Sequence, residues 1–324
     1  MWDVEKNVAI YYFCINSKQM DLFTIPRCNQ CPRQCNALRD SLSLGYCRST
    51  NEPEIASICI HKGEEPVLSG IHGVCNLFFS HCNLQCVYCQ NYQISLNSTG
   101  RISNYTLSSA CDAIAQCLDA GIKIVGFVSP SHQVLSMVEI VNELKRRSYA
   151  PRILYNSNGY DRVDILRELE DVVDIYLPDF KYGSNELGRQ LSAVPDYFDA
   201  ASLALKEMFR QKGTYLSLDD DEVAESGLII RHLVLPGFVS NSIEVLDYIA
   251  REISPNVHIS LMAQYSPPFA ISNFTELNRP LTVDEYRSVT SHFEALGFHK
   301  GWVQELCSAL NYNPDFTKKH PFEL

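Results

Sequence analysis

The chain has 324 residues, of which 46% are hydrophobic, and it carries 38 acidic and 27 basic side chains for a formal net charge of −11. This hydrophobic content excludes a disordered chain and is ample for a buried core. No apolar run approaches the ~20 residues of a membrane-spanning helix, and an acidic chain without a basic stretch is a poor candidate for a nucleic-acid binder. The start of the chain lacks a basic region followed by an apolar one, so we expect a cytoplasmic protein without membrane attachment.

The first 70 residues show little periodicity and contain four prolines, which is typical of a loop-rich segment. Within it, the spacing C-x2-C-x3-C-x11-C groups Cys28, Cys31, Cys35 and Cys47. Because thiols stay reduced in the cytosol, clustered cysteines point to a metal rather than to disulfides. Four thiolates suit structural zinc or an iron–sulfur cluster, and the alternative is a set of free structural cysteines.

From residue 74 onward, short apolar runs alternate with amphipathic stretches. The predicted strands cover residues 74–80, 122–129, 152–156, 172–178, 228–236 and 257–264. The predicted helices cover residues 107–119, 133–147, 161–169, 196–211, 242–252 and 282–296. This alternation indicates a parallel sheet covered by helices. Six βα units are too few for a closed eight-stranded barrel, which leaves a partial barrel or a doubly wound sheet.

A second cysteine group, Cys82, Cys86 and Cys89, directly follows the first of these strands. Loops at this position carry the active sites of βα architectures. Zinc would need a fourth ligand, for which the adjacent His81 is a candidate. A [4Fe–4S] cluster held by three thiolates would instead leave one iron open for a substrate or cofactor.

The cysteine content as a whole is unusual, because the chain has 13 cysteines. An odd number prevents complete internal disulfide pairing. Six cysteines lie outside the two groups, and we expect them to be small buried hydrophobic side chains. These are Cys14, Cys59, Cys75, Cys111, Cys117 and Cys307.

The C-x3-C-x2-C spacing with Tyr88 before the third cysteine resembles the signature of the radical S-adenosylmethionine (SAM) superfamily. Further segments resemble, in order, the motifs of pyruvate formate-lyase activating enzyme-like proteins: FFSHCNLQCVYCQNYQIS, YNSNGY, DIYLPDFKYG and RHLVLPG. The resemblance is to a subgroup that opens with a C-x2-C-P-R-x-C segment, and it runs over residues 28–265. It favours iron–sulfur over zinc at the second cysteine group.

The resemblance also implies the fold and its division. We expect an α/β partial (β/α)6 TIM-like barrel with a cysteine-rich, loop-rich N-terminal extension. The extension would cover residues 1–70 and carry a second metal site, zinc or iron–sulfur. The radical SAM barrel would cover residues 71–300, and a C-terminal tail residues 301–324.

The function implied is that of a radical SAM oxidoreductase with a [4Fe–4S] cluster and SAM as cofactors. A one-electron donor such as flavodoxin or ferredoxin would reduce the cluster, and SAM would be cleaved to methionine and a 5′-deoxyadenosyl radical that abstracts a hydrogen atom. The expected substrate is a protein, a glycyl radical enzyme activated by this chemistry. One alternative is radical modification of a peptide, RNA or small metabolite. The other is a zinc- or cluster-bearing binding or electron-transfer protein without SAM chemistry.

Cofactor contacts are also implied by the resemblance. Cys82, Cys86 and Cys89 correspond to the cluster ligands, and Tyr88 to an aromatic side chain near the cluster and the adenine. The family's Gly-Gly-Glu segment, which contacts the SAM amino group, is replaced here by residues 128–132. Candidate SAM contacts are Ser129, Ser131 and His132 in that segment, and Asn156, Asn158, Asp179, Lys181 and Arg231 at later strand ends. No residue that donates or relays the hydrogen atom is identified.

Overall fold

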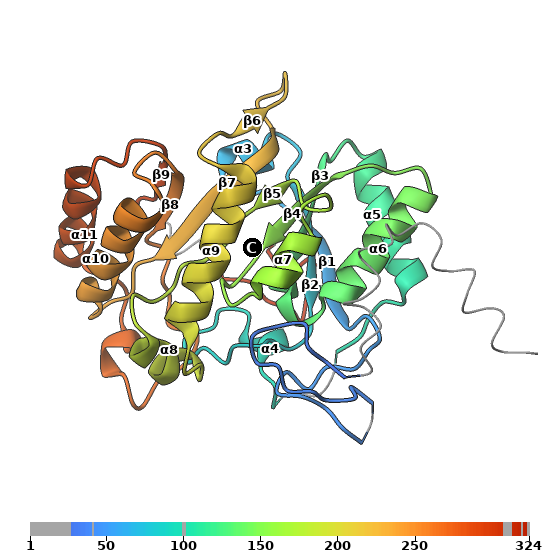
Figure 1. Ribbon diagram of the computed structural model, residues 1–324, viewed down its shortest axis with the longest axis horizontal. Coiled ribbons are helices and arrows are strands. Elements are labelled where there is room, and N and C mark those ends of the chain that lie inside the picture. The colour runs from blue at the N-terminus through green and yellow to red at the C-terminus, as the bar shows by residue number, and fades with distance from the viewer. Residues whose placement is uncertain (1–26, 41, 99–101, 307–312, 319, 323–324) are drawn as a thin grey trace, which may run out of the picture.

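The computed structural model describes residues 27–40, 42–98, 102–306, 313–318 and 320–322, so Cys14 and Cys307 lie outside the described residues. One open, curved sheet organises the molecule (Figure 1). Its strands are β1 (Ile55–His61), β2 (Val74–Phe79), β3 (Ile124–Val128), β4 (Arg152–Asn156), β5 (Ile175–Tyr176), β6 (Ser217–Leu218), β7 (Ala224–Leu233), β8 (His258–Met262) and β9 (Gly301–Val303).

The strands follow the order β1-β2-β3-β4-β5-β7-β8-β9, with β6 paired to β7. Every neighbouring pair from β2 to β9 along this path is parallel, whereas β1 and β6 pair antiparallel with β2 and β7. Among the described residues β9 does not pair with β1, so the barrel is open. The predicted α/β partial barrel is confirmed.

The longer helices cover the outer face of the sheet, whereas the short helices α3 (Pro66–Ser69) and α4 (Tyr92–Ser95) lie at its two ends (Figure 1). The others are α5 (Leu107–Asp119), α6 (Val134–Arg146), α7 (Val163–Glu168), α8 (Asn185–Ser192), α9 (Tyr197–Lys212), α10 (Val239–Tyr248) and α11 (Val283–Ala295), with short 3-10 turns at Pro130–His132 and Thr275–Asn278 and a π-helix at Ile249–Ile253. Apolar side chains of the longer helices share one core with the strands: Ile114, Ile140, Leu166, Leu205, Leu246 and Val289. Helices gathered on one face distinguish a barrel from a doubly wound sheet.

The inner face of the barrel is built in layers, because every second residue of a strand points to the same side. At the amino ends of the strands, an apolar layer lies under α3 and closes the barrel: Leu68, Val74, Ile124, Leu154, Ile175 and Ile229. Two residues further along β2, β4 and β7 the inward positions are polar, with Asn76, Asn156 and Arg231. The fold thus places polar side chains inside the barrel, next to an apolar layer that fills its amino-terminal end.

The predicted helices and strands are largely present, with differences at specific places. The strand predicted at 172–178 is reduced to Ile175–Tyr176, and the helix predicted at 242–252 begins earlier, at Val239, and ends in the π-helix. Strand β1, helix α8 and strand β9 were not predicted. Thr282 caps α11 in a capping box with Glu285, as the sequence pattern of this helix start suggests.

The domain boundaries at residues 70 and 300 do not coincide with structural breaks. Strand β1 and helix α3 lie before residue 71 but belong to the barrel, since β1 pairs with β2 over residues 55–61. Strand β9 lies after residue 300 and pairs with β8. The tail then returns to the start of the sheet, where Phe322 lies over His61 with ring centroids 4.0 Å apart. No helix of the described part of the chain is long and apolar enough to cross a membrane.

Candidate active site

A cavity of about 480 Å³ occupies the inside of the open barrel. The loop after β2 contributes Cys82, Cys86 and Cys89 to its wall, at the carboxyl ends of the strands. At its other end, between α3 and the inner face of β7, lie Glu64 and Glu65. The cavity therefore connects the cysteine loop with a charged floor.

The cysteine loop is held in place by backbone hydrogen bonds from both sides. The N–H groups of Gln85 and Val87 donate to the carbonyls of Ser192 and Leu191, at 3.0 and 2.9 Å, where α8 ends. The loop begins at His81, whose φ of +66° turns the chain away from β2. These contacts orient three cysteines of one short loop toward the same cavity.

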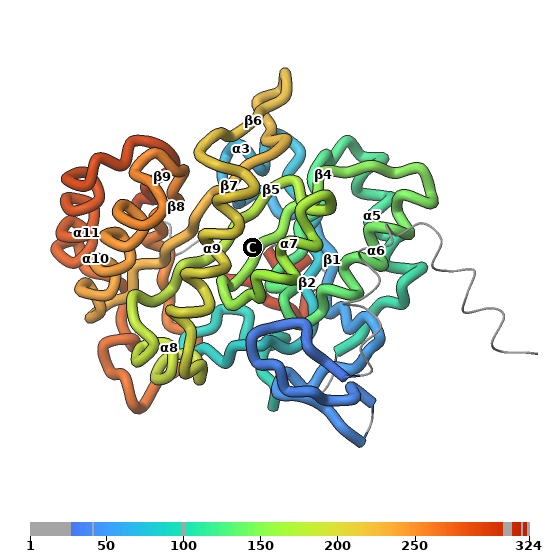
Figure 2. The backbone as a smooth tube through the Cα atoms, in the orientation of Figure 1, coloured from blue at the N-terminus to red at the C-terminus, as the bar shows by residue number. Residues whose placement is uncertain are grey.

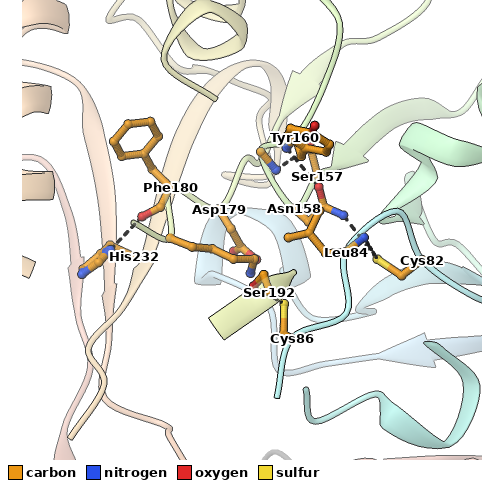
Figure 3. Close-up of polar contacts among 12 residues, drawn as sticks. Cys82, Leu84, Cys86, Ser157, Asn158, Tyr160, Asp179, Phe180, Ser192 and His232 are labelled. Carbon is orange, nitrogen blue, oxygen red and sulfur yellow. Dashed lines mark hydrogen bonds and ion pairs between the residues drawn. The ribbon is translucent and has the colours of Figure 1, made fainter. Parts of the chain in front are cut away.

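Each of the three thiols has a side-chain hydrogen-bond partner, and Figure 3 shows Asn158 beside Cys82 and Ser192 beside Cys86. Asn158 Nδ2 donates to Cys82 Sγ at 3.4 Å, and Ser192 Oγ donates to Cys86 Sγ at 2.9 Å. The Sγ of Cys89 lies 3.1 Å from Ser95 Oγ. The thiols are half-buried, so each retains a surface that a further ligand can reach.

Most of the predicted SAM contacts line this cavity. They are Tyr88, Ser129, Asn156, Asn158, Asp179, Lys181 and Arg231. Ser131 and His132 do not line it, because the chain turns at Ser129, which has a φ of +48°. His132 is buried instead and pairs through Nε2 with the carbonyl of Ser80 at 2.9 Å. Of the three candidate contacts in the segment that replaces Gly-Gly-Glu, the structure therefore brings Ser129 to the cavity and turns Ser131 and His132 away.

Comparison with known proteins agrees with this geometry. A family model described as the radical SAM superfamily matches residues 76–218, from β2 to β6. The uncharacterized protein MJ0674 of Methanocaldococcus jannaschii is 32% identical over 265 residues, which cover 80% of this chain and 71% of that protein. The chain belongs to the radical SAM superfamily.

Two solved structures of HydG, a maturase of the [FeFe]-hydrogenase, are also similar to this radical SAM protein. One has a TM-score of 0.47 at 12% identity over 70% of this chain. The HydG of Carboxydothermus hydrogenoformans has a TM-score of 0.44 at 15% identity over 69% of this chain. The chain spans about half the length of either structure, 51% and 52%.

Radical SAM enzymes use a [4Fe–4S] cluster and SAM, and the cysteine loop has the donors that such a cluster needs. Within the described residues, no three His, Cys, Asp or Glu side chains are arranged around a single metal ion. In a cluster, by contrast, each thiolate binds its own iron. Burial raises the pKa of Cys82 to about 12 and that of Cys86 to about 11. Iron binding therefore has to displace protons from these thiols.

One charged pair lies next to the cysteine loop. Lys181 Nζ contacts Asp179 Oδ2 at 2.5 Å, and both side chains follow β5. Burial by itself would lower the pKa of Lys181, but Asp179 and Cys86 hold it above its ordinary value. Lys181 is therefore a fixed positive charge facing the cysteines.

The floor of the cavity contains two acidic residues that were not predicted, Glu64 and Glu65, together with the predicted Arg231. Arg231 donates through Nε to Glu65 Oε1 at 2.8 Å and through Nη2 to Glu65 Oε2 at 2.6 Å, and it also contacts Glu64. Glu64 Oε1 accepts from Asn76 Nδ2 at 2.6 Å and lies 3.0 Å from His61 Nδ1. Two acidic side chains in a segment without periodicity carry no sequence signal for this role.

The four cysteines of the N-terminal segment lie near one another at the carboxyl ends of the strands. Burial raises the pKa of Cys31 to about 12, and the nearby thiols of Cys47, Cys28 and Cys35 act in the same direction. The chain folds back between the first and third of them, since Cys28 N donates to Ala37 O at 2.7 Å. A Cβ on Gly45 would lie 2.5 Å from Cys35 Sγ, so only glycine leaves room for this thiol.

Proposed function

We propose that this radical SAM enzyme holds its [4Fe–4S] cluster with Cys82, Cys86 and Cys89 and abstracts a hydrogen atom from a substrate inside the barrel. The observation that carries the proposal is that three cysteines of one loop face a cavity lined by polar strand ends. Held by these cysteines, the cluster would supply the electron for the reductive cleavage of SAM. The free thiols and the oxygen-sensitive cluster suit the cytoplasm.

In this proposal, residues of the chain bind SAM and orient it. Lys181 offers its ammonium group to the carboxylate of SAM, and Asp179 holds Lys181 in place. The amides of Asn156 and Asn158 and the hydroxyl of Ser129 offer neutral hydrogen bonds to amino and ribose groups. The barrel walls around the cavity limit the access of water to the reacting groups.

A Cys86→Ala variant tests the proposal. The wild-type chain, reconstituted anaerobically and reduced with dithionite, is expected to form 5′-deoxyadenosine from SAM, and the variant is expected to fall to background. Cys111→Ala is the matched control, because Cys111 is buried in the outer core and does not line the cavity. Wild-type product no higher than the background would refute the proposal and favour a protein without SAM chemistry, and equal product above background would refute the role of Cys86.

For the substrate, we propose a glycyl radical enzyme as protein partner, with flavodoxin or ferredoxin as electron donor. The support is the resemblance of the motifs at residues 78–95, 155–160, 174–183 and 231–237 to those of pyruvate formate-lyase activating enzyme-like proteins. The test incubates the reduced enzyme, SAM and a candidate glycyl radical enzyme and records the electron paramagnetic resonance spectrum. A glycyl radical signal that depends on Cys86 is expected.

A second candidate function is radical modification of a small metabolite, a peptide or RNA. The charged residues at the floor of the cavity favour a substrate that places a small polar group next to them. Glu64 and Glu65 together exceed the charge of Arg231, and Asn76 Oδ1 is buried without a hydrogen-bond partner among the described residues. To discriminate between the two candidates, a cell extract is separated by molecular mass and each fraction is tested for stimulation of 5′-deoxyadenosine formation. A stimulating fraction of low molecular mass would favour this second candidate over a protein substrate.

We also propose a second metal site at Cys28, Cys31, Cys35 and Cys47, holding zinc or an iron–sulfur cluster. The support is that four thiols lie near one another in a segment with little core of its own. Replacing Cys31 and Cys47 with alanine is expected to lower the metal content of the anaerobically purified protein, measured by elemental analysis, while Cys111→Ala leaves it unchanged. Unchanged iron and zinc in the double variant would contradict the second site.

A further inference from the structure

Ser192 joins the cysteine loop to two buried tyrosines outside the cluster's own motif. It is the last residue of α8 and is fully buried. Its Oγ lies 2.9 Å from Cys86 Sγ and 2.6 Å from the hydroxyl of Tyr182. The Tyr182 hydroxyl lies in turn 2.6 Å from that of Tyr88. These contacts form a continuous chain from Tyr88 to Cys86.

The directions of these hydrogen bonds are determined once Cys86 is a thiolate. A thiolate can only accept, so Ser192 must donate its single hydroxyl proton to Cys86. Ser192 then accepts from Tyr182, which in turn accepts from Tyr88. Both tyrosine side chains are buried, and a neutral phenol hydroxyl supplies the proton that this order requires. Hydrogen bonds arranged head to tail polarise and strengthen one another.

The bond to Cys86 is the shortest of the side-chain hydrogen bonds to the three thiols. The partner of Cys89, Ser95, lies at 3.1 Å, and Asn158 lies 3.4 Å from Cys82. Of these three partners, Ser192 is the one that continues, within the described residues, into a buried chain of further hydroxyl groups. Hydrogen bonds to the sulfur atoms of an iron–sulfur cluster stabilise its reduced, more negative state and so raise its reduction potential.

We propose that Ser192 is a positioning residue whose hydroxyl, supported by Tyr182 and Tyr88, raises the reduction potential of the cluster through Cys86. The inference rests on the proposed function, since it needs Cys86 as a ligand. It concerns the ease of reduction of the cluster and not the identity of the substrate. Its test therefore uses neither SAM nor a substrate.

The experiment measures the midpoint potential of the reconstituted cluster by redox titration with electron paramagnetic resonance detection. Ser192→Ala is expected to shift the potential to more negative values. Tyr182→Phe keeps the hydroxyl of Ser192 but removes its donor, so a smaller shift in the same direction is expected. Ser202→Ala is the matched control, because Ser202 is a buried serine of α9 whose hydroxyl has no partner in the described part of the chain.

The outcomes separate this inference from the proposed function. A Ser192→Ala potential equal to that of Ser202→Ala, with equal iron content, would overturn the inference even if 5′-deoxyadenosine is still formed. If Ser192→Ala cannot hold iron, Tyr182→Phe decides in the same way, since its cluster is expected to assemble normally. A failure of Cys86→Ala to lose the cluster would instead overturn the proposed function.

Discussion

At the scale of single residues, buried histidines make the stability of this fold depend on pH. His232 lies fully buried beside the site, with Nδ1 2.8 Å from the carbonyl of Phe180 and Nε2 2.9 Å from Ser242 Oγ. A neutral ring satisfies both contacts, with Nδ1 as donor and Nε2 as acceptor. Burial lowers the pKa of His232 to about 4, and it lowers the pKa of His132 to about 4 as well. Both rings are therefore neutral in the folded chain near neutral pH.

The stability of the folded chain is expected to fall as the pH is lowered from 7 to 5. In the unfolded chain a histidine has a pKa of about 6.5, so between about 6.5 and 4 the unfolded state binds more protons and stability rises with pH. Each histidine contributes roughly 2 kcal/mol to the change between pH 7 and 5. Urea unfolding at the two pH values measures it.

A His232→Gln variant shows how much of this pH dependence is due to His232. It cannot take up a proton, so its free energy of unfolding is expected to change less between pH 7 and 5 than that of the wild type. His299→Gln serves as the control, because His299 is exposed. A pH dependence of His232→Gln as steep as that of the wild type would contradict the assignment.

At the scale of elements, α8 is the part of the fold that positions the cysteine loop. Its last carbonyls, those of Leu191 and Ser192, accept hydrogen bonds from the loop, and its first turn is capped by Ser184. Gly188 allows it to approach α9 closely, since a Cβ at this position would lie 2.5 Å from the Cβ of Tyr197. The geometry of the cysteines therefore depends on the packing of a short helix.

A Gly188→Ala substitution is expected to destabilise the protein although alanine favours helices. The added methyl group would meet the Cβ of Tyr197 and the carbonyl of Val194, and such overpacking costs about 1–3 kcal/mol. Urea unfolding provides the measurement. Gln190→Ala on the exposed side of α8 is the matched control and is expected to be neutral or slightly stabilising. A neutral Gly188→Ala variant would show that α8 can move without cost.

At the scale of the whole molecule, the N-terminal segment lies over the carboxyl ends of the strands. Figure 2 shows it as the dark-blue tube near α4, at the opposite end of the molecule from α3. Arg33 donates to the carbonyls of Asn83 and Ala193 at 2.9 and 2.6 Å and stacks on Tyr46 at 3.4 Å. Asn97 Nδ2 donates to the carbonyls of Tyr46 and Cys82. Hydrogen bonds of Arg33 and Asn97 thus connect the N-terminal segment to the cysteine loop.

An Arg33→Ala variant is expected to loosen this segment from the barrel. It removes two hydrogen bonds from a charged group, each worth about 1.5–3 kcal/mol, together with the stacking contact. Hydrogen exchange of residues 27–54 is expected to accelerate relative to the barrel strands. Arg27→Ala is the control, because Arg27 is exposed and its hydrogen bond to Asn36 stays within the segment. Equal exchange in both variants would argue against this anchoring role.

Local sequence patterns by themselves determined the barrel helices and most strands, as well as the cysteine loop. Apolar runs such as 152–156 predict their strand because burial on both faces needs continuous hydrophobic residues. The loop of Cys82, Cys86 and Cys89 could be recognised because its three cysteines lie within eight residues. The strand at 172–178 was overextended, since its continuation carries Asp179 and Lys181 into the cavity.

Only the tertiary structure decided which distant residues meet these local features. Ser192 and Cys86 are 106 positions apart, and Arg231 and Glu65 are 166 apart. Helix α8 has two leucines among its eight residues, so its position depends on packing against α9. Ser131 and His132 were predicted at the cavity, but the left-handed turn at Ser129 directs them into the core. Short-range patterns specify helices and strands, whereas contacts between distant elements depend on how the whole folded chain packs.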